Sequence, residues 1–452
     1  MRLILLTSPI ARFGFHAVCG ASLWIWFLAA IAAPLELEVM TRADSGAGSL
    51  REALETAAAI PERPVRIHFG NRNGLFSTPQ TIELESPLPL VVGKVTIDGF
   101  IRNLLWRAYG ATISGADTHR ILEVAEGGSL HLSGVTLRYG RAKSGGAILN
   151  RGRLEVEGVS LFDNSAVSEG GAITNLGELW LINSTVAWNE APRGGGLAHV
   201  AGNARLINAT LYQNESDEGA ALWSQSALHL ANTILAGDPG LAHCVNDGPL
   251  SAATTHNLIQ GPQRGCGEPL LTVDPEIEAR LGYYNGPTPT LPTGGASPVI
   301  NLGLNEAAVN ARGETLRWDQ RGNGDPRFAS GFTDIGAFER QGHLPSEFIV
   351  DTIEDTGLRA CSRAAAADCP LRAALQLAAA ARHSTPIRFH PDIFDEPRII
   401  ALPHIPELGD QVILMDGKGT AGITITVPEA VTWEAVNGVR IEVRSQSVTT
   451  QP

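Results

Sequence analysis

Apolar and polar residues alternate in short segments through the middle of the chain. The segments Leu154-Glu155-Val156 and Leu179-Trp180-Leu181 carry an apolar residue at the first and third positions. A two-residue period is typical of β-strands that bury one face, whereas helices show a period of about 3.6 residues. The pattern therefore predicts short strands in this part of the chain.

The predicted strands recur every 24 or 25 residues. The glycine pair Gly145-Gly146 returns at Gly170-Gly171 and at Gly195-Gly196, and Gly219-Ala220 follows. A repeat of this length cannot hold two helices, but it accommodates three short strands and three turns. A leucine-rich repeat is similar in length, but its L-x-x-L-x-L-x-x-N signature is absent from the sequence. We therefore expect an all-β fold, a parallel β-helix whose coils stack on one another.

Asparagine occupies one fixed position of the repeat, at Asn164, Asn189 and Asn214. This spacing predicts a ladder of side-chain amides inside a turn, each bonded to the next coil. The glycine pairs suit turns that need a positive φ or a close approach of two backbones. Asn183-Ser184-Thr185 and Asn208-Ala209-Thr210 match the glycosylation sequon, but they also lie on the repeat and are interpreted as structural.

The segment before the repeats predicts a helix that caps the first coil. Ser49-Leu50-Arg51-Glu52 begins a helix over residues 49–59, with Ser49 as N-cap and Glu52 completing a capping box. Strands are expected at residues 65–69, 81–84 and 95–97. A cap is needed because the open end of a solenoid exposes apolar surface and unpaired backbone groups.

The same order of elements returns near the C-terminus. Phe348-Ile349-Val350-Asp351 matches Leu37-Glu38-Val39-Met40, and a second helix start follows at residues 369–375. The sequence thus predicts five regions. They are a signal peptide (1–32), an N-terminal cap with the first coils (33–110), the β-helix repeats (111–240), C-terminal coils with a closing region (241–342), and a second, truncated cap-like module (343–452).

The N-terminus has the features of an export signal. Arg2 and Arg12 are positive, residues 17–28 are apolar, and Ala30-Ile31-Ala32 forms a small-x-small cleavage site. An uncleaved membrane anchor is the alternative, since residues 13–35 would just span a bilayer of about 30 Å. We favour cleavage, which predicts a secreted or outer-surface protein with no further membrane span.

Four of the five cysteines remain after such cleavage, and an even number in an exported chain suggests disulfides. The expected local pairs are Cys244 with Cys266, and Cys361 with Cys369. Metal binding is the alternative, but no C-x-x-C motif or nearby histidine pair supports it. His243, beside Cys244, is interpreted as an exposed turn residue.

The net charge narrows the class of partner. At −13 at pH 7, the chain has no basic surplus to neutralise phosphates, so nucleic acid is not expected to bind. Acidic polysaccharides would be repelled on average, although a local basic group can overcome the average charge. One such group precedes the glycine repeats: Arg138, Arg141, Lys143, Arg151 and Arg153.

At its cap and its downstream segments the chain resembles exported bacterial right-handed parallel β-helix proteins with a CSLREA motif and a choice-of-anchor Q region. Gly48-Ser49-Leu50-Arg51-Glu52-Ala53-Leu54 matches the motif with glycine in place of cysteine, and the second copy keeps Cys369 but has Pro370 and Ala373 instead of Ser and Glu. The matching downstream segments are residues 274–275, 285–290, 297–301, 319–322 and 334–339. The resemblance implies export and the β-helix fold but little about chemistry, because this fold hosts several functions.

Acidic residues at the repeat period are candidate ligands for Ca²⁺ or a sugar. Glu190 and Glu215 are 25 residues apart, and Asp217 is near them in the same turn region, as are Asp163, Glu169 and Glu218. A solvated turn face explains such acids as well, and this interpretation is preferred. Ca²⁺ is the only cofactor considered, and no metal site is predicted.

Aromatic residues in consecutive coils offer a second candidate surface. Trp180, Trp188, Tyr212 and Trp223 would form a sugar-stacking platform if they were exposed on one face. By strand alternation Trp180 is expected to point away from Leu179 and Leu181. Asp319-Gln320-Arg321-Gly322 is interpreted as a turn with an Asp–Arg bond that closes the last coils.

Two functional hypotheses follow from these patterns. The first is a non-enzymatic exported or cell-surface protein that acts in adhesion or surface interaction, with glycans or surface proteins as partners. The alternative is a carbohydrate-active β-helix, a polysaccharide lyase or hydrolase, or a glycan-binding module. Hydrolysis would need paired carboxylates on one face.

Overall fold

The computed structural model describes residues 33–70, 79–102, 108–278, 280–295, 297–322, 324–328, 333–340, 347–354, 369–381, 386–402, 414–428 and 434–443. The predicted signal peptide, residues 1–32, lies outside the described residues. Among the described residues, no helix has the length and apolar character needed to cross a bilayer.

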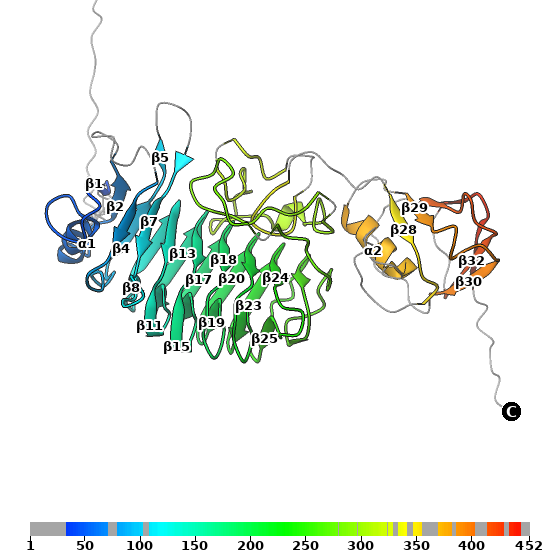
Figure 1. Ribbon diagram of the computed structural model, residues 1–452, viewed down its shortest axis with the longest axis horizontal. Coiled ribbons are helices and arrows are strands. Elements are labelled where there is room, and N and C mark those ends of the chain that lie inside the picture. Colours follow the sequence, from blue (N-terminus) through cyan, green and yellow to red (C-terminus); the bar gives the residue numbers. More distant parts are fainter. Residues whose placement is uncertain are drawn as a thin grey trace, which may run out of the picture. The chain divides into compact units, whose positions relative to one another are not determined.

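Most strands lie in three long sheets (Figure 1), in which all neighbouring strands are parallel. Sheet 1 contains β1 (Leu35–Val39), β2 (Val65–Phe69), β4 (Lys94–Asp98), β9 (Ser129–Ser133), β13 (Arg153–Glu157), β17 (Glu178–Ile182), β20 (Asn203–Ile207) and β23 (Ala227–Ala231). Sheet 2 contains β3 (Thr81–Glu83), β7 (Ala111–Ser114), β10 (Val135–Arg138), β14 (Ser160–Phe162), β18 (Thr185–Ala187), β21 (Thr210–Tyr212), β24 (Ile234–Ala236) and β26 (Leu258–Ile259). Sheet 3 contains β8 (Leu122–Val124), β12 (Ile148–Asn150), β16 (Ile173–Asn175), β19 (Leu197–His199), β22 (Leu222–Ser224), β25 (Cys244–Asn246) and β27 (Gln263–Arg264).

Successive strands contribute to the three sheets in turn. β13, β14 and β16 belong to sheets 1, 2 and 3, and β17, β18 and β19 repeat that order. A short parallel pair, β11 (Arg141–Ser144) with β15 (Ser165–Glu169), and an antiparallel pair, β5 (Ile101–Arg102) with β6 (Ala108–Tyr109), complete this part. The predicted all-β chain with long parallel sheets is confirmed.

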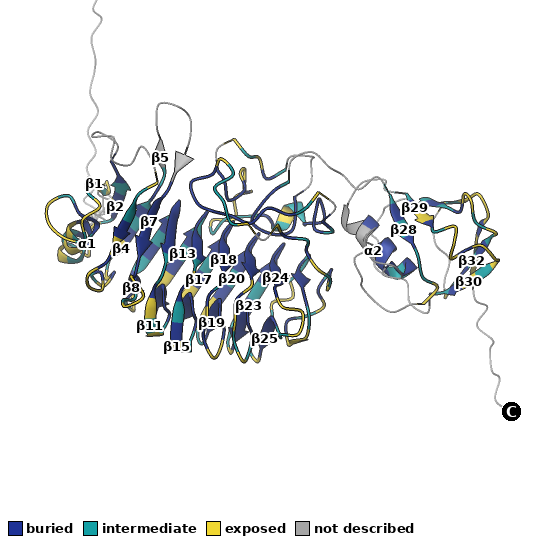
Figure 2. Ribbon diagram, viewed as in Figure 1, coloured by how far each residue is buried: buried dark blue, intermediate teal, exposed yellow. Residues whose placement is uncertain are grey.

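The inward-facing residues of the sheets form the core. Leu154 and Val156 are fully buried, and the register pairs them with Leu179 and Leu181, one repeat later. These residues belong to one hydrophobic cluster with contributions from all three sheets, and Figure 2 shows the buried residues along the strands. Burying a leucine or valine side chain contributes about 1.5–3 kcal/mol, so the stacked apolar residues fix the register of the repeats.

The glycines of the repeat adopt the predicted left-handed conformation, with one correction to their alignment. Gly145, Gly170, Gly194 and Gly219 have φ between 60° and 66°. The register pairs Ile173 with Leu197, so Gly194 and not Gly195 is the equivalent of Gly170. The predicted equivalence of Gly195 with Gly170 was therefore wrong by one residue. The register is set by the buried residues of the strands and not by the position of the glycine pair in the sequence.

The predicted asparagine ladder is present and buried. The amide nitrogen Nδ2 of Asn164 donates to Oδ1 of Asn189 at 2.9 Å, and Nδ2 of Asn189 donates to Oδ1 of Asn214 at 2.9 Å. Asn189 Oδ1 also accepts the backbone N–H of Asn164 at 3.0 Å, while its Nδ2 donates to the carbonyl groups of Leu161 and Ala187. Each amide thus satisfies turn groups that would otherwise be buried without partners.

A second ladder follows the strands of sheet 3. Asn150 Nδ2 donates to Asn175 Oδ1 at 2.6 Å, and Asn175 Nδ2 lies 2.9 Å from Nδ1 of His199. All three side chains are fully buried. Burial lowers the pKa of His199, which favours the neutral ring that can accept this bond.

The predicted capping helix is α1 (Leu50–Ala59), which packs on β1 and β2. The hydroxyl of Ser49 accepts from the N–H of Glu52 at 3.1 Å, as expected for the N-cap. The Glu52 carboxylate accepts from Gly48 N at 2.6 Å, one residue before the N-cap position expected for a capping box. Arg51 pairs with Asp44 at 2.6 Å and donates to the carbonyl of Pro87 at 2.7 Å, which attaches the helix to the loop after β3.

The C-terminal module has the element order predicted from the first cap. One sheet contains β28 (Phe348–Val350), β29 (Ile387–Phe389), β31 (Leu414–Asp416) and β33 (Glu434–Val436), and a second contains β30 (Arg398–Ala401), β32 (Ile423–Val427) and β34 (Val439–Val443). The helix α2 (Leu371–Ala381) follows β28, as α1 follows β1. Both sheets are parallel.

The asparagine ladder predicts a large loss of stability when its middle rung is removed. Asn189→Ala leaves the buried N–H of Asn164 without its acceptor, which costs about 1–3 kcal/mol, and it also removes the side-chain bonds to the carbonyl groups of Leu161 and Ala187. We expect the free energy of unfolding to fall by about 3 kcal/mol or more in urea denaturation. The exposed Asn203→Ala is the control, and an equal change in both variants would contradict the role of the ladder.

Candidate functional site

The predicted acidic residues lie on the outside of the repeats. Glu190 pairs with Glu215 through an isolated parallel bridge, and both side chains are exposed, as is Asp217. Their neighbours are engaged in ion pairs, Glu169 with Arg193 at 3.2 Å and Glu218 with Arg264 at 2.9 Å. In the described part of the chain, no three His, Cys, Asp or Glu side chains gather closely enough to bind a metal ion.

The four aromatic residues do not share an exposed face, so the predicted stacking platform is wrong. Tyr212 and Trp223 are buried, Trp188 is half-buried, and Trp223 packs with Ala198 and Val245. The guanidinium of Arg193 lies 4.7 Å from the centre of the Trp223 ring. Only the expectation for Trp180 is confirmed, since Leu179 and Leu181 are fully buried while Trp180 is half-buried on the other face of β17.

The basic group is also divided among separate interactions. Arg151 pairs with Glu123, Arg153 pairs with Glu178 at 3.5 Å, and the guanidinium of Arg138 lies 4.9 Å from the centre of the Tyr139 ring. Arg141 and Lys143 are exposed on β11. Two of the five side chains are therefore neutralised by a neighbouring carboxylate.

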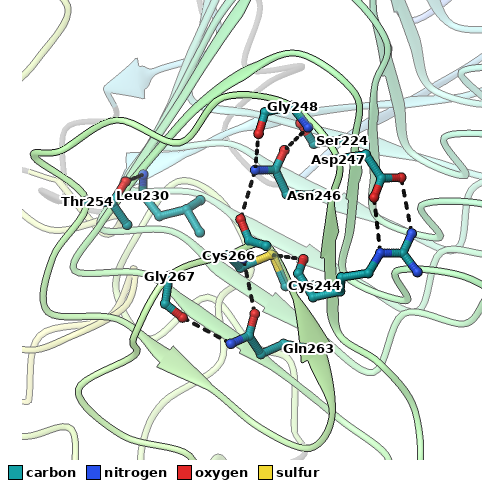
Figure 3. The surroundings of a disulfide bond; sticks show 12 residues. Ser224, Leu230, Cys244, Asn246, Asp247, Gly248, Thr254, Gln263, Cys266 and Gly267 are labelled. Carbon is teal, nitrogen blue, oxygen red and sulfur yellow. Dashed lines mark hydrogen bonds and ion pairs between the residues drawn. A yellow bond between two sulfur atoms is a disulfide. The ribbon is translucent and has the colours of Figure 1, made fainter.

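The expected disulfide between Cys244 and Cys266 is present (Figure 3), and its Cα atoms are 6.3 Å apart. Next to it, Asn246 donates to the carbonyl groups of Gly248 and Gly265 at 2.9 Å each. Cys369 is also disulfide-bonded, but its expected partner Cys361 lies outside the described residues.

His243 is not the exposed turn residue that we expected. Its side chain is fully buried, and its Nε2 lies 2.9 Å from the carbonyl oxygen of Asp238. The residue precedes β25, where the chain turns inward toward Cys244, and burial lowers the pKa of its imidazole.

The outward face of sheet 1 carries a row of functional groups that the sequence motifs do not reveal. His131, Glu155, Trp180, Arg205 and His229 are paired in register across five adjacent strands, and each is half-buried. We call these five residues the outer row. The five residues are spaced 24 or 25 apart in the sequence, so each occupies the same position of its repeat as Trp180 does. This spacing could have been recognised from the sequence alone.

Neighbouring members of the outer row contact one another. His131 Nδ1 lies 3.3 Å from Glu155 Oε1, and the guanidinium of Arg205 lies 4.7 Å from the centre of the Trp180 ring. Burial lowers the pKa of His229, and the nearby charge of Arg205 lowers it further. A shallow pocket of about 170 Å³ lies at this end of the row, lined by Arg205, His229, Leu250 and Ser251 among others.

Two carboxylates on this face have pKa values shifted in opposite directions. The hydrogen bond with His131 lowers the pKa of Glu155, while burial raises the pKa of Glu157. The two residues are two positions apart in β13, so their side chains lie on the same face of the strand. Arg312, from residues that lie beside this face, adds positive charge near both.

The outward face of sheet 2 is covered by the described part of residues 280–340, which we call the closing segment. These are the yellow-green loops beside β18 and β24 in Figure 1. Thr185 Oγ1 donates to Gln320 Oε1 at 2.6 Å, and Thr210 Oγ1 accepts from Ala337 N at 2.9 Å. Both threonines are buried. This face is therefore occupied by the chain itself. The closing segment also reaches sheet 1, where Ala308 and Leu316 pack with Ile182 and Ile207 and Trp180 packs against their cluster, so the outer row is only partly accessible.

The predicted Asp–Arg bond in the closing segment is confirmed. Arg321 donates from Nε and Nη2 to Asp319 Oδ2 at 2.9 and 2.7 Å, and its guanidinium lies 3.9 Å from the Phe338 ring centre. Asp319 Oδ2 also accepts from the N–H of Glu339 at 2.7 Å. Asp319 and Arg321 are thus bonded to each other, and they also contact Phe338 and Glu339 near the end of the closing segment.

Buried carboxylates next to this bond predict a pH-dependent stability. Burial raises the pKa of Asp334 to about 7, and burial with the nearby Asp334 raises that of Glu339. The pKa values of unfolded carboxylates are about 4, so the folded protein holds extra protons between about pH 4 and 7. We expect the free energy of unfolding to fall as the pH rises through about 7.

Asp334→Asn should make this decline shallower, because an uncharged side chain removes one titrating group from the buried site. Urea denaturation at a series of pH values measures the slope. The exposed Asp217→Asn is the control, and parallel curves for Asp334→Asn and the unsubstituted protein would contradict the assignment.

No family model matches the chain, and no curated protein matches it either.

Proposed function

We propose that the chain is an exported right-handed parallel β-helix protein, similar to the CSLREA and choice-of-anchor Q group, and that it acts in adhesion or surface interaction without catalysis. The cyclic order of strands in sheets 1, 2 and 3 and the stacked asparagine amides support a closed β-helix. The helix α1 at the first strands has the position of a solenoid cap.

The disulfide supports export. The bond between Cys244 and Cys266 joins β25 to the chain after β27, at the end of the repeats. Disulfides persist in oxidising compartments and are rare in the cytosol. This agrees with the signal peptide expected at residues 1–32 and with a secreted or outer-surface location.

The observation that carries the interaction role is the outer row on sheet 1. One polar or aromatic side chain from each of five adjacent strands is half-exposed there, next to the cluster in which Ala308 and Leu316 of the closing segment pack on sheet 1. Side chains in register present the same spacing along the row, about 4.8 Å per strand. A ligand with a repeating structure, such as a glycan chain, fits this arrangement.

The row combines groups that bind sugars and surface proteins. The half-buried Trp180 leaves part of its ring exposed beside the cluster it packs against, and Arg205 and His229 offer donors beside the pocket at the end of the row. Aromatic and arginine side chains are also the residues that dominate protein interfaces. We therefore assign the outward face of sheet 1 as the binding face.

A glycan-array screen with the purified protein tests this assignment. Arg205→Ala removes the guanidinium that contacts Trp180 and lines the pocket, and we expect binding to weaken by about tenfold or more. Arg141→Ala removes an exposed arginine from β11, away from the outer row, and should leave binding unchanged. Equal binding by both variants, or the absence of any glycan ligand, would contradict this function.

A second candidate function rests on Glu155 and Glu157. A glycoside hydrolase needs one ionised and one protonated carboxyl group near the same bond, and the opposite pKa shifts of these residues supply that difference. Glu155 is registered with Trp180, and Glu157 with the buried Ile182.

A polysaccharide-degradation screen, with and without Ca²⁺, tests the second candidate. For a hydrolase, Glu155→Gln and Glu157→Gln should each lower the rate at least about 100-fold, because each removes one of the two required groups. Glu178→Gln changes an exposed carboxylate on the adjacent strand and should retain activity. Activity that survives both substitutions would exclude this pair as the catalytic residues.

A further inference from the structure

In the described part of the C-terminal module, β34 is the last strand and lies at an edge of its sheet. Among the described residues it pairs only with β32. The apolar side chain of Ile441 in β34 is half-buried, whereas Ile425, its partner in β32, is fully buried. An edge of this kind is a template for another strand.

The direction of the backbone groups in β34 follows from its pairing. Ile423 N donates to the carbonyl of Gly438, and Ile423 is registered with Val439. Because backbone groups alternate in direction along a strand, those of Arg440 and Glu442 point toward β32. The N–H and C=O groups of Val439, Ile441 and Val443 therefore point outward, to the edge.

The sequence of β34, Val-Arg-Ile-Glu-Val, is complementary to itself when read in the opposite direction. An antiparallel pair centred on Ile441 places Ile441 opposite its own copy and Arg440 opposite Glu442 of the other copy, twice. Both charged side chains are exposed on the outward face. The pattern therefore offers two ion pairs and a continued apolar contact in one register.

The hydrogen bonds select the same register. In an antiparallel pair, the residues that exchange hydrogen bonds face each other at alternate positions. Centring on Ile441 makes Ile441 such a position, and its backbone groups are among those that point outward. Arg440 and Glu442 then form the non-hydrogen-bonded pairs, whose Cα atoms come within about 4.5 Å, so their side chains lie closest.

We infer that β34 is a self-association edge, through which two copies of this chain pair in antiparallel fashion about a two-fold axis at Ile441. The interface is isologous, as in most dimers. It extends each three-stranded sheet into one of six strands, and it covers the half-buried Ile441 of both copies.

Charge reversal tests the pairing without disturbing the core. In Arg440→Glu, each ion pair becomes a pair of like charges, and Glu442→Arg has the same effect with the opposite sign. Sedimentation analysis of the full chain should show a dimer for the unsubstituted protein and a dissociation constant raised about tenfold or more for each variant. Lys418→Glu makes the same charge change as Arg440→Glu at an exposed turn and should remain dimeric.

Mixing provides the decisive measurement. When Arg440→Glu is mixed with Glu442→Arg, every opposed pair contains one glutamate and one arginine, so heterodimers should form. The double variant R440E/E442R should likewise recover the dimer. A monomeric unsubstituted chain, or an association that ignores both reversal and mixing, would overturn the inference.

A cysteine at the two-fold axis reports the register. Ile441→Cys places two sulfur atoms on residues whose Cα atoms are about 5.5 Å apart, within disulfide range. Oxidation should give a covalent dimer on non-reducing gels. Ile399→Cys, on the exposed outer face of β30, is the control. Equal cross-linking by both variants would contradict the two-fold axis at Ile441.

Discussion

Parallel pairing between successive repeats is the constraint on which the rest of the structure depends. Each strand bonds to the equivalent strand before and after it, and the buried residues stack at the same positions, as Leu154 does on Leu179. A slip of one residue would turn the apolar side chains outward, so the register tolerates no drift. Ser165 pairs with Glu190 at a step of 25 residues, whereas Ile173 pairs with Leu197 at a step of 24, so the turn between Glu190 and Gly194 is one residue shorter and the strand register is kept.

The same register also determines which polar groups are hydrogen-bonded in the interior and which remain exposed. Inside the turns, stacked amides such as Asn189 satisfy backbone groups that water cannot reach. On the outward faces of the sheets, the polar residues at one position of successive repeats lie next to one another and form a row. The threonine row of sheet 2 bonds to the closing segment, whereas the row containing Glu155 and Arg205 stays half-exposed. One repeating geometry thus places one row of polar side chains against the chain's own closing segment and leaves another row partly exposed.

The sequence alone was sufficient to predict those features that depend only on one repeat and the repeat next to it. The period, the asparagine ladder, the helix after Ser49 and the disulfide at Cys244 all follow from local patterns. The burial of Tyr212 did not, because it depends on packing with distant residues such as Leu271 and Leu291. The burial of His243 depends on how the loop at Asp238 folds back on it. The outer row was missed for another reason. His131, Trp180 and Arg205 are different residue types, so they are related only by occupying the same position in successive repeats.

The two sequons have a consequence for how the chain can be produced. Asn183 and Asn208 are buried, and their Nδ2 atoms donate to the carbonyl groups of Trp318 and Asp334 in the closing segment. An N-linked sugar is attached to this same nitrogen atom, before or during folding. A host that glycosylates nascent chains would therefore place a bulky group where the closing segment must dock. The native structure requires synthesis in a compartment that leaves both amides unmodified.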